Sequence, residues 1–158
     1  LVGPDFRKQF FPDLKYVAAA DEPSLARGKY LAHGPGACVG CHSPFNMMEM
    51  KLDGAPFSGS DQAEPDPKDS TMVYRMPNLT PDPETGHITA WDEEQFVTRF
   101  RAGRQRPTSK MPYEAFREMT DADLRSVYRY LRSLPPTKHY IGPTWRKGDE
   151  DPARDKKS

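Results

Sequence analysis

The chain of 158 residues has two cysteines, no long apolar run and no net charge. Two cysteines exclude the kind of disulfide framework that supports small secreted domains. The longest apolar stretch, residues 16–20, is far shorter than the roughly 20 residues of a membrane-spanning helix. Apolar residues make up only 35% of the chain, and 17 prolines interrupt it. The composition therefore indicates one domain with a small core, long loops and no membrane span.

Both cysteines belong to one short motif, Cys38-Val39-Gly40-Cys41-His42. A C-x-x-C-H pentad is typical of the covalent attachment site of a c-type haem. Two thiols one turn apart can add to the two vinyl groups on one porphyrin edge, and the following histidine can bind the iron. We therefore expect one haem c, attached through Cys38 and Cys41 and ligated by His42. A large apolar macrocycle would also supply buried surface that the small core lacks.

Other uses of a C-x-x-C pair fit this chain less well. A thioredoxin-like redox motif requires a surrounding β-α-β pattern, whereas a helical run precedes this pentad and a proline-rich loop follows it. A structural zinc site needs further paired nitrogen or sulfur ligands, and the remaining histidines, His33, His87 and His139, are scattered singly. A disulfide across two intervening residues would close too small a loop to stabilise the fold much.

The sequence predicts mainly helices joined by proline-rich loops. Helical spacing of apolar residues, with capping or terminating residues, marks the segments 22–33, 92–102, 112–118 and 121–134. Asp21, Asp92 and Thr120 are the expected N-caps of the three longer helices. Residues 43–90 contain seven prolines and are expected to form irregular loops.

Three parts are expected along the chain: an extended arm over residues 1–20, a haem domain over residues 21–136 and a tail over residues 137–158. Phe6, Phe10 and Phe11 give the arm apolar weight, so we expect it to lie across the domain; a docking segment for a partner is the alternative. Apart from Trp145, the tail beyond Ile141 is polar and charged, and its end is expected to be mobile.

The second axial position of the iron is open to more than one residue. Three methionines lie too close in sequence to His42 to reach the opposite face of the haem: Met47, Met48 and Met50. Two others precede proline, which stiffens the loop that holds them: Met76 and Met111. We expect Met111, which lies just before the terminal helix, to be the ligand. Met76, a histidine, water or no ligand remain alternatives.

These motifs, in this order, resemble a class I cytochrome c, in particular the bacterial periplasmic single-haem modules related to the cytochrome subunits of membrane-bound alcohol and sugar dehydrogenases. The matching stretches are residues 26–32, 38–42, 78–86, 91–96, 111–113 and 119–136. The resemblance implies a mostly α-helical fold whose first and last helices cross near Gly28 and Tyr130 beside the haem. It also implies His42 and Met111 as axial ligands. Asn78, Thr80 and Trp91 match positions that line the haem or its propionates in such modules.

The pentad and the resemblance together predict a periplasmic electron carrier that is not an enzyme in its own right. Its partners would be redox proteins: a dehydrogenase, an oxidase or another cytochrome. It could work as a monomer or as the electron-accepting subunit of a dehydrogenase complex. A haem enzyme or ligand sensor with a displaceable sixth ligand is the alternative. Because c-haem is attached outside the cytoplasmic membrane, we expect any secretory signal to have been removed from a chain that begins at Leu1.

The charges are distributed unevenly along the chain. Residues 49–94 contain 11 acidic and 3 basic side chains, whereas residues 95–147 contain 12 basic and 4 acidic ones. Such asymmetry could orient the molecule toward a redox partner, unless the two sets interleave on the folded surface and cancel. The basic half lacks regular basic–aromatic interleaving, so nucleic acid is not an expected partner.

Overall fold

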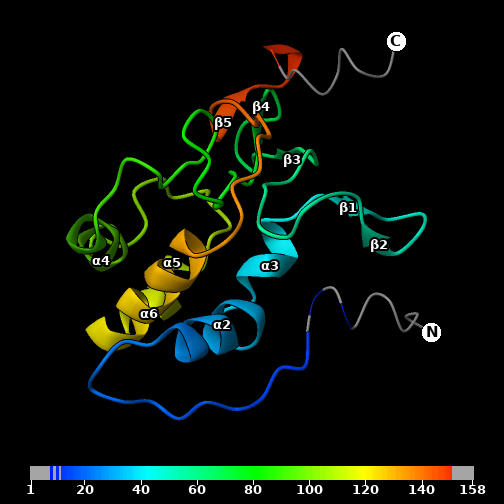
Figure 1. The fold of residues 1–158 in the computed structure, drawn as a ribbon. Helices are drawn as coiled ribbons and strands as arrows, with labels where there is room; N and C mark the ends of the chain where they lie inside the picture. The colour runs from blue at the N-terminus through cyan, green and yellow to red at the C-terminus, as the bar shows by residue number, and fades with distance from the viewer. Residues whose placement is uncertain (1–7, 9, 11, 151–158) are drawn as a thin grey trace.

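The computed structural model describes residues 8, 10 and 12–150, and Figure 1 shows most of the helices on one side and two small sheets on the other. The helices are α2 (Leu25–His33), α3 (Cys38–Cys41), α4 (Glu93–Arg101), α5 (Tyr113–Arg117) and α6 (Asp121–Arg132), with a 3-10 helix, η1, at Gly148–Glu150. One antiparallel sheet pairs β1 (Phe45–Asn46) with β2 (Lys51–Leu52). The other has the order β3 (Glu64–Pro65), β4 (Met72–Tyr74), β5 (Trp145–Lys147). No helix in the described ranges combines the length and hydropathy needed to cross a bilayer.

The expected helices are present, but the fold is not simply α-helical with irregular loops. Residues 43–90 contain the strands β1 to β4, and β5 comes from the segment expected to be a tail. These strands are two or three residues long. Such short strands show no readable alternation of apolar and polar residues, because that pattern needs at least four positions.

The caps of α4 and α6 are those that the sequence predicts. The Asp92 carboxylate accepts a hydrogen bond from the Gln95 amide at 2.8 Å, and the Gln95 side chain accepts one from the Asp92 amide at 2.9 Å. This reciprocal pair is a capping box. At α6, the Thr120 hydroxyl accepts from the Asp123 amide at 3.1 Å.

The N-cap of α2 is Ser24 and not Asp21, so the predicted start of this helix is wrong by three residues. The Ser24 hydroxyl accepts a hydrogen bond from the Arg27 amide at 3.2 Å. The Ser24 amide in turn donates to the Ser126 hydroxyl of α6 at 3.0 Å. A contact with α6 therefore helps to select which of two capping residues begins the helix.

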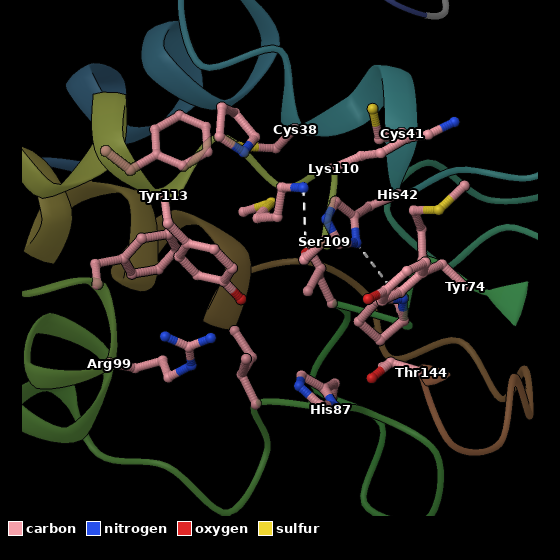
Figure 2. Close-up of a pocket in the computed structure, with 18 of the residues that line it drawn as sticks. Cys38, Cys41, His42, Tyr74, His87, Arg99, Ser109, Lys110, Tyr113 and Thr144 are labelled. Atoms are coloured by element: carbon pink, nitrogen blue, oxygen red, sulfur yellow. Dashed lines mark hydrogen bonds between the residues drawn. The ribbon is translucent and has the colours of Figure 1, made fainter. Parts of the chain in front are cut away.

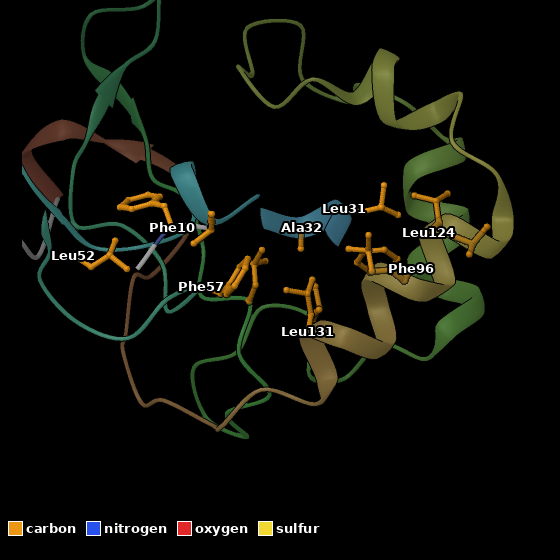
Figure 3. Packing of buried hydrophobic residues seen from close by; sticks show 13 residues of the cluster. Phe10, Leu31, Ala32, Leu52, Phe57, Phe96, Leu124 and Leu131 are labelled. Carbon is orange, nitrogen blue, oxygen red and sulfur yellow. The ribbon is translucent and has the colours of Figure 1, made fainter. Parts of the chain in front are cut away.

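Helices α2 and α6 cross in direct contact at Gly28. A Cβ atom at this position would lie 2.0 Å from the Ser126 carbonyl oxygen and 2.7 Å from the Tyr130 Cβ, so only glycine fits. Arg27 and Asp123 flank the crossing with two parallel hydrogen bonds of 2.8 and 2.9 Å. The implied crossing of the first and last helices is thus present. Figure 3 shows the apolar cluster around it, which includes Leu31, Ala32, Phe96, Leu124 and Leu131.

The described part of the N-terminal arm packs on the domain through Phe10. Its ring is buried and meets Phe45 edge to face at 5.8 Å. The His33 Nδ1 donates to the Phe10 carbonyl oxygen at 2.8 Å, and its Nε2 lies 2.8 Å from the Tyr130 hydroxyl. Phe6 and Phe11 lie outside the described residues. The course of the whole arm therefore stays a prediction.

The acidic and basic segments meet on the folded surface through ion pairs. The described pairs between them include Lys110 with Glu64, Arg125 with Glu93 and Glu94, Arg129 with Glu93, and Lys138 with Glu84. The charges of these side chains therefore cancel locally, which weakens any dipole that the sequence asymmetry would produce.

Candidate haem-binding site

A largely apolar cavity of about 660 Å³ lies between the helices and the three-stranded sheet. Its volume lies within the range usual for cofactor sites, roughly 300–1,000 Å³. Apolar side chains of α2, α4 and α6 form one part of the wall, among them Leu31, Phe96, Leu124 and Leu131. Tyr74 and Trp145 of the sheet and residues of the loop between α4 and α5 form another part. The cavity brings together five predicted site residues: Cys38, Cys41, His42, Trp91 and Met111.

Helix α3 presents both cysteines to this cavity, as Figure 2 shows. Its single turn is closed by a hydrogen bond of 2.9 Å from the His42 amide to the Cys38 carbonyl oxygen. Burial raises the pKa of the Cys38 thiol to about 12, and burial followed by the charge of Glu64 also raises that of Cys41. Both side chains are therefore neutral thiols at neutral pH, the form whose S–H can add across a vinyl double bond.

The imidazole of His42 is held in one tautomer. The ring is 6% exposed, and its Nδ1 lies 3.0 Å from the Pro77 carbonyl oxygen (Figure 2). Because a carbonyl can only accept, Nδ1 carries the hydrogen. Burial lowers the pKa of His42 to about 4, so the ring is neutral at pH 7 and its Nε2 has a free lone pair. No described residue hydrogen-bonds to this Nε2. The arrangement is the usual one for a metal-binding histidine, oriented by a backbone carbonyl.

Both candidate methionines line the cavity. Met76 directly precedes Pro77, whose carbonyl holds His42. Met111 ends the loop between α4 and α5, where its amide donates to the Ser109 hydroxyl at 3.4 Å. Its carbonyl oxygen accepts from the Tyr113 amide at 2.8 Å at the start of α5. The two methionines therefore come from different parts of the wall.

Asn78 and Thr80 do not belong to the described cavity lining. Both are 1% exposed and form one network. The Asn78 Oδ1 accepts from the Thr80 amide and hydroxyl at 2.9 and 2.7 Å, and its Nδ2 donates to the Thr137 carbonyl at 2.8 Å. They join the segment after Pro77 to the chain beyond α6, and their contact with haem stays a prediction.

Two residues that the sequence analysis did not predict to belong to the site line the end of the cavity away from the cysteines: Arg99 and His87 (Figure 2). The Arg99 guanidinium lies 4.1 Å from the Tyr113 ring centroid and donates to the Gly103 carbonyl at 2.8 Å. Among the described residues, no carboxylate pairs with it. Burial and then the charge of Arg99 lower the pKa of His87. Helical spacing could have found Arg99, because it lies three residues after Phe96 on the cavity face of α4.

The chain is similar to cytochrome c subunits of bacterial dehydrogenases. The chain is 34% identical over 143 residues to the cytochrome c subunit of the alcohol dehydrogenase (quinone) of Gluconacetobacter polyoxogenes, covering 83% of the chain and 29% of the subunit. It is 34% identical over 143 residues to the gluconate 2-dehydrogenase cytochrome c subunit of Pantoea cypripedii, covering 82% and 31%. A diheme cytochrome c-type of Cereibacter sphaeroides is 30% identical over 122 residues, covering 72% and 36%. No family model matches the chain.

The pentad on α3, the oriented His42 and these similarities define the class: the chain is a c-type cytochrome. It is similar to one module of the cytochrome c subunits of alcohol and gluconate dehydrogenases. The chain spans about a third of the length of these relatives. These relatives are named as cytochrome c subunits of dehydrogenases.

Proposed function

We propose that the chain transfers single electrons through one haem c, attached at Cys38 and Cys41, with His42 and Met111 as axial ligands. The observation that carries this proposal is the buried, neutral His42 beside two thiols on the wall of an apolar cavity. Bound haem supplies an iron that alternates between Fe(III) and Fe(II). By this proposal the chain passes electrons on and transforms no substrate.

Three features of His42 suit it to hold an iron in both oxidation states. Its lowered pKa keeps the ring unprotonated, and the bond to Pro77 keeps Nε2 directed away from that carbonyl. The same bond raises the basicity of the ring. Its place directly after Cys41 ties the ligand to the attachment site. The chain therefore needs little rearrangement when the electron arrives or leaves.

Two observations support Met111 over Met76 as the second ligand. Met76 directly precedes Pro77, whose carbonyl oxygen holds His42, so Met76 belongs to the segment that already positions the first ligand. Met111 belongs to a separate part of the cavity wall, between α4 and α5. The two axial positions of a haem lie on opposite faces, so two ligands from separate walls fit this geometry best. A thioether ligand and burial both raise the reduction potential.

Arg99, His87 and Trp91 suit the carboxylate end of the cofactor. The propionates of haem project from the edge opposite the vinyl groups, and Arg99 and His87 lie away from Cys38 and Cys41 in the cavity (Figure 2). Arg99 offers a cation that no described carboxylate neutralises. Charge-assisted bonds of this kind are stronger than neutral ones and orient a planar group.

The partners would be redox proteins, and the site of action would be the periplasm. The relatives are named as cytochrome subunits of dehydrogenases, so a dehydrogenase that donates electrons is the partner we favour. One haem follows from the single pentad, although a diheme cytochrome is among the relatives. Association with a second haem-bearing chain is compatible with the same chemistry.

The visible spectrum of the purified holoprotein tests this proposal. We expect a six-coordinate spectrum with the weak far-red methionine–iron band in the oxidised form. Met111→Ala should abolish that band and lower the reduction potential while the haem stays attached, whereas Met76→Ala should keep the band. Rapid binding of carbon monoxide to the reduced wild type would contradict methionine ligation and favour a ligand sensor or haem enzyme.

A further inference from the structure

Three segments far apart in the sequence meet at the carboxylate of Asp66, which directly follows β3 and is 5% exposed. The Thr108 hydroxyl, from the loop between α4 and α5, donates to its Oδ2 at 2.7 Å. The Trp145 indole N–H, from β5, donates to the same oxygen at 3.0 Å. The Lys68 amide donates to Oδ1 at 2.9 Å. One buried carboxylate therefore joins the α4–α5 loop to the three-stranded sheet.

Two further contacts strengthen this connection. The Tyr74 hydroxyl of β4 lies 2.5 Å from the Thr108 oxygen. The Tyr74 hydroxyl also contributes a hydrogen bond to Asp66, so Tyr74 and Thr108 belong to one network around this carboxylate. The Arg106 guanidinium lies over the Trp145 ring, 3.6 Å from its centroid. Arg106 and Thr108, both on the loop, are thus held by side chains of β4 and β5.

The charge state of Asp66 suits this role. Burial by itself raises the pKa of the carboxyl, but hydrogen bonds from the Lys68 amide, Thr108, Trp145 and Tyr74 outweigh burial and lower the pKa to about 2. Asp66 is therefore ionised at neutral pH, and its bonds to Thr108 and Trp145 are charge-assisted.

Asp66 and Thr108 lie outside the described lining of the cavity, although their partners Tyr74 and Trp145 belong to it. Tyr74, Trp145 and Met111 line the cavity, whereas the described lining includes neither Asp66 nor Thr108. Thr108 lies three residues before Met111 on the same loop. A tether at Thr108 limits how far that loop can move away from the cavity, so it limits the movement of Met111.

We propose that Asp66 is a positioning residue that holds the α4–α5 loop through Thr108 and Trp145, so that Met111 stays on the haem iron and external ligands are kept out. This inference rests on the proposed ligation by Met111. Asp66 acts on the iron only through the α4–α5 loop. The strand β5 is needed because it carries Trp145, which donates a hydrogen bond to Asp66.

An exposed ion pair outside the described cavity lining provides a control. Lys138 pairs with Glu84, and their side chains are 66% and 65% exposed. An exposed pair between flexible side chains contributes little, because water and salt screen it. Loss of this pair should therefore not release the loop.

The experiment measures how fast cyanide binds to the oxidised holoprotein, since binding requires Met111 to leave the iron. Thr108→Val keeps the shape of the side chain and removes its hydrogen bond, and Trp145→Phe keeps an aromatic ring and removes its N–H. We expect each variant to bind cyanide roughly tenfold faster, because each loses a bond to a charged group. Lys138→Gln should bind cyanide at the wild-type rate.

The outcomes separate this inference from the proposed function. Slow binding in the wild type, rapid binding in Met111→Ala, and wild-type rates in both Thr108→Val and Trp145→Phe would overturn the role of Asp66 alone. Rapid binding in the wild type would overturn methionine ligation and the role of Asp66 with it. Thermal unfolding followed by circular dichroism accompanies each measurement, and Trp145→Phe decides the question if Thr108→Val does not fold.

Discussion

The two sides of the cavity are built in different ways. The helical side depends on local signals and apolar contact: caps at Asp92 and Thr120, and a crossing at Gly28. The sheet side has very short strands and depends on buried polar bonds over long separations. Thr108 and Trp145 lie 42 and 79 positions from Asp66, which binds them both. The starts of α4 and α6 are thus encoded locally, whereas the wall that carries the proposed methionine ligand is assembled by distant residues.

The largest loss of stability is expected when the crossing of α2 and α6 is disrupted. Gly28→Ala places a methyl group 2.0 Å from the Ser126 carbonyl, so α2 and α6 must separate. We expect a loss of about 3 kcal/mol in the free energy of unfolding. Urea unfolding of the holoprotein measures it. Gly148→Ala is the control, because a Cβ at this glycine would meet no described atom closer than 3.4 Å; equal losses in both variants would contradict this account.

A smaller loss is expected when the polar network beside the sheet is broken. Asn78→Ala removes the buried hydrogen bonds of Asn78 with the Thr80 amide and hydroxyl and with the Thr137 carbonyl. We expect a loss of about 2 kcal/mol in the free energy of unfolding. Lys138→Gln, which breaks an exposed pair with Glu84 nearby, should cost less than about 0.5 kcal/mol. A large drop in reduction potential with little loss of stability in Asn78→Ala would instead indicate direct contact with the haem.

Acid should weaken the helical side through His33, which links α2 to the arm and α6. Burial lowers the pKa of His33 below its ordinary value of 6.5. The unfolded chain therefore takes up the proton first as the pH falls through 6.5, and the free energy of unfolding decreases from there toward the folded-state pKa. Above pH 6.5, His33 is neutral in both the folded and the unfolded chain, so it no longer lowers the free energy of unfolding.

The measurement for His33 is the urea midpoint of the wild type and of His33→Gln at several pH values. The stability of the variant should depend less on pH than that of the wild type between about pH 7.5 and about pH 5. Parallel curves for the two proteins would show that His33 does not carry this dependence.

The smallest expected effect is that of Arg99 on the reduction potential. Its substitution tests whether the helical side also influences the potential of the cofactor. Arg99→Gln removes a cation from the cavity. Loss of this positive charge favours the oxidised iron, because the oxidised form is the more positive one. We expect the reduction potential to fall by up to about 60 mV, the value of a tenfold change for one electron. Redox titration measures it. Arg101→Gln is the control, since Arg101 lies on the same helix but pairs with Asp121 at 2.5 Å; an equal shift there would rule out a specific role for Arg99.

Much of the helical side and the centre of the site could be predicted. The pentad placed Cys38, Cys41 and His42 together, and the cap at Asp92 was correct, because these signals lie within a few consecutive residues. The strands could not be predicted, since they are too short for a periodic pattern and depend on pairing between β4 and β5, for example Tyr74 with Trp145.

The long-range contacts of several residues could not be predicted. Asn78 and Thr80 bond to each other and to Thr137 beyond α6, an arrangement that no local pattern announces. Trp145, expected in a polar tail, lies on the cavity wall and donates to Asp66. Both outcomes depend on which distant segments the folded chain brings into contact.

By itself, the sequence determined the attachment motif, the adjacent histidine and the helices that begin at Asp92 and Thr120, because residues at most four positions apart specify them. Only the tertiary structure decided that α2 begins after Ser24, since Ser126 of α6 binds the Ser24 amide. It likewise decided that the carboxylate of Asp66 accepts hydrogen bonds from both Thr108 of the α4–α5 loop and Trp145 of β5. A buried carboxylate is stabilised by the donors that folding places around it, and a linear sequence does not show which donors those are.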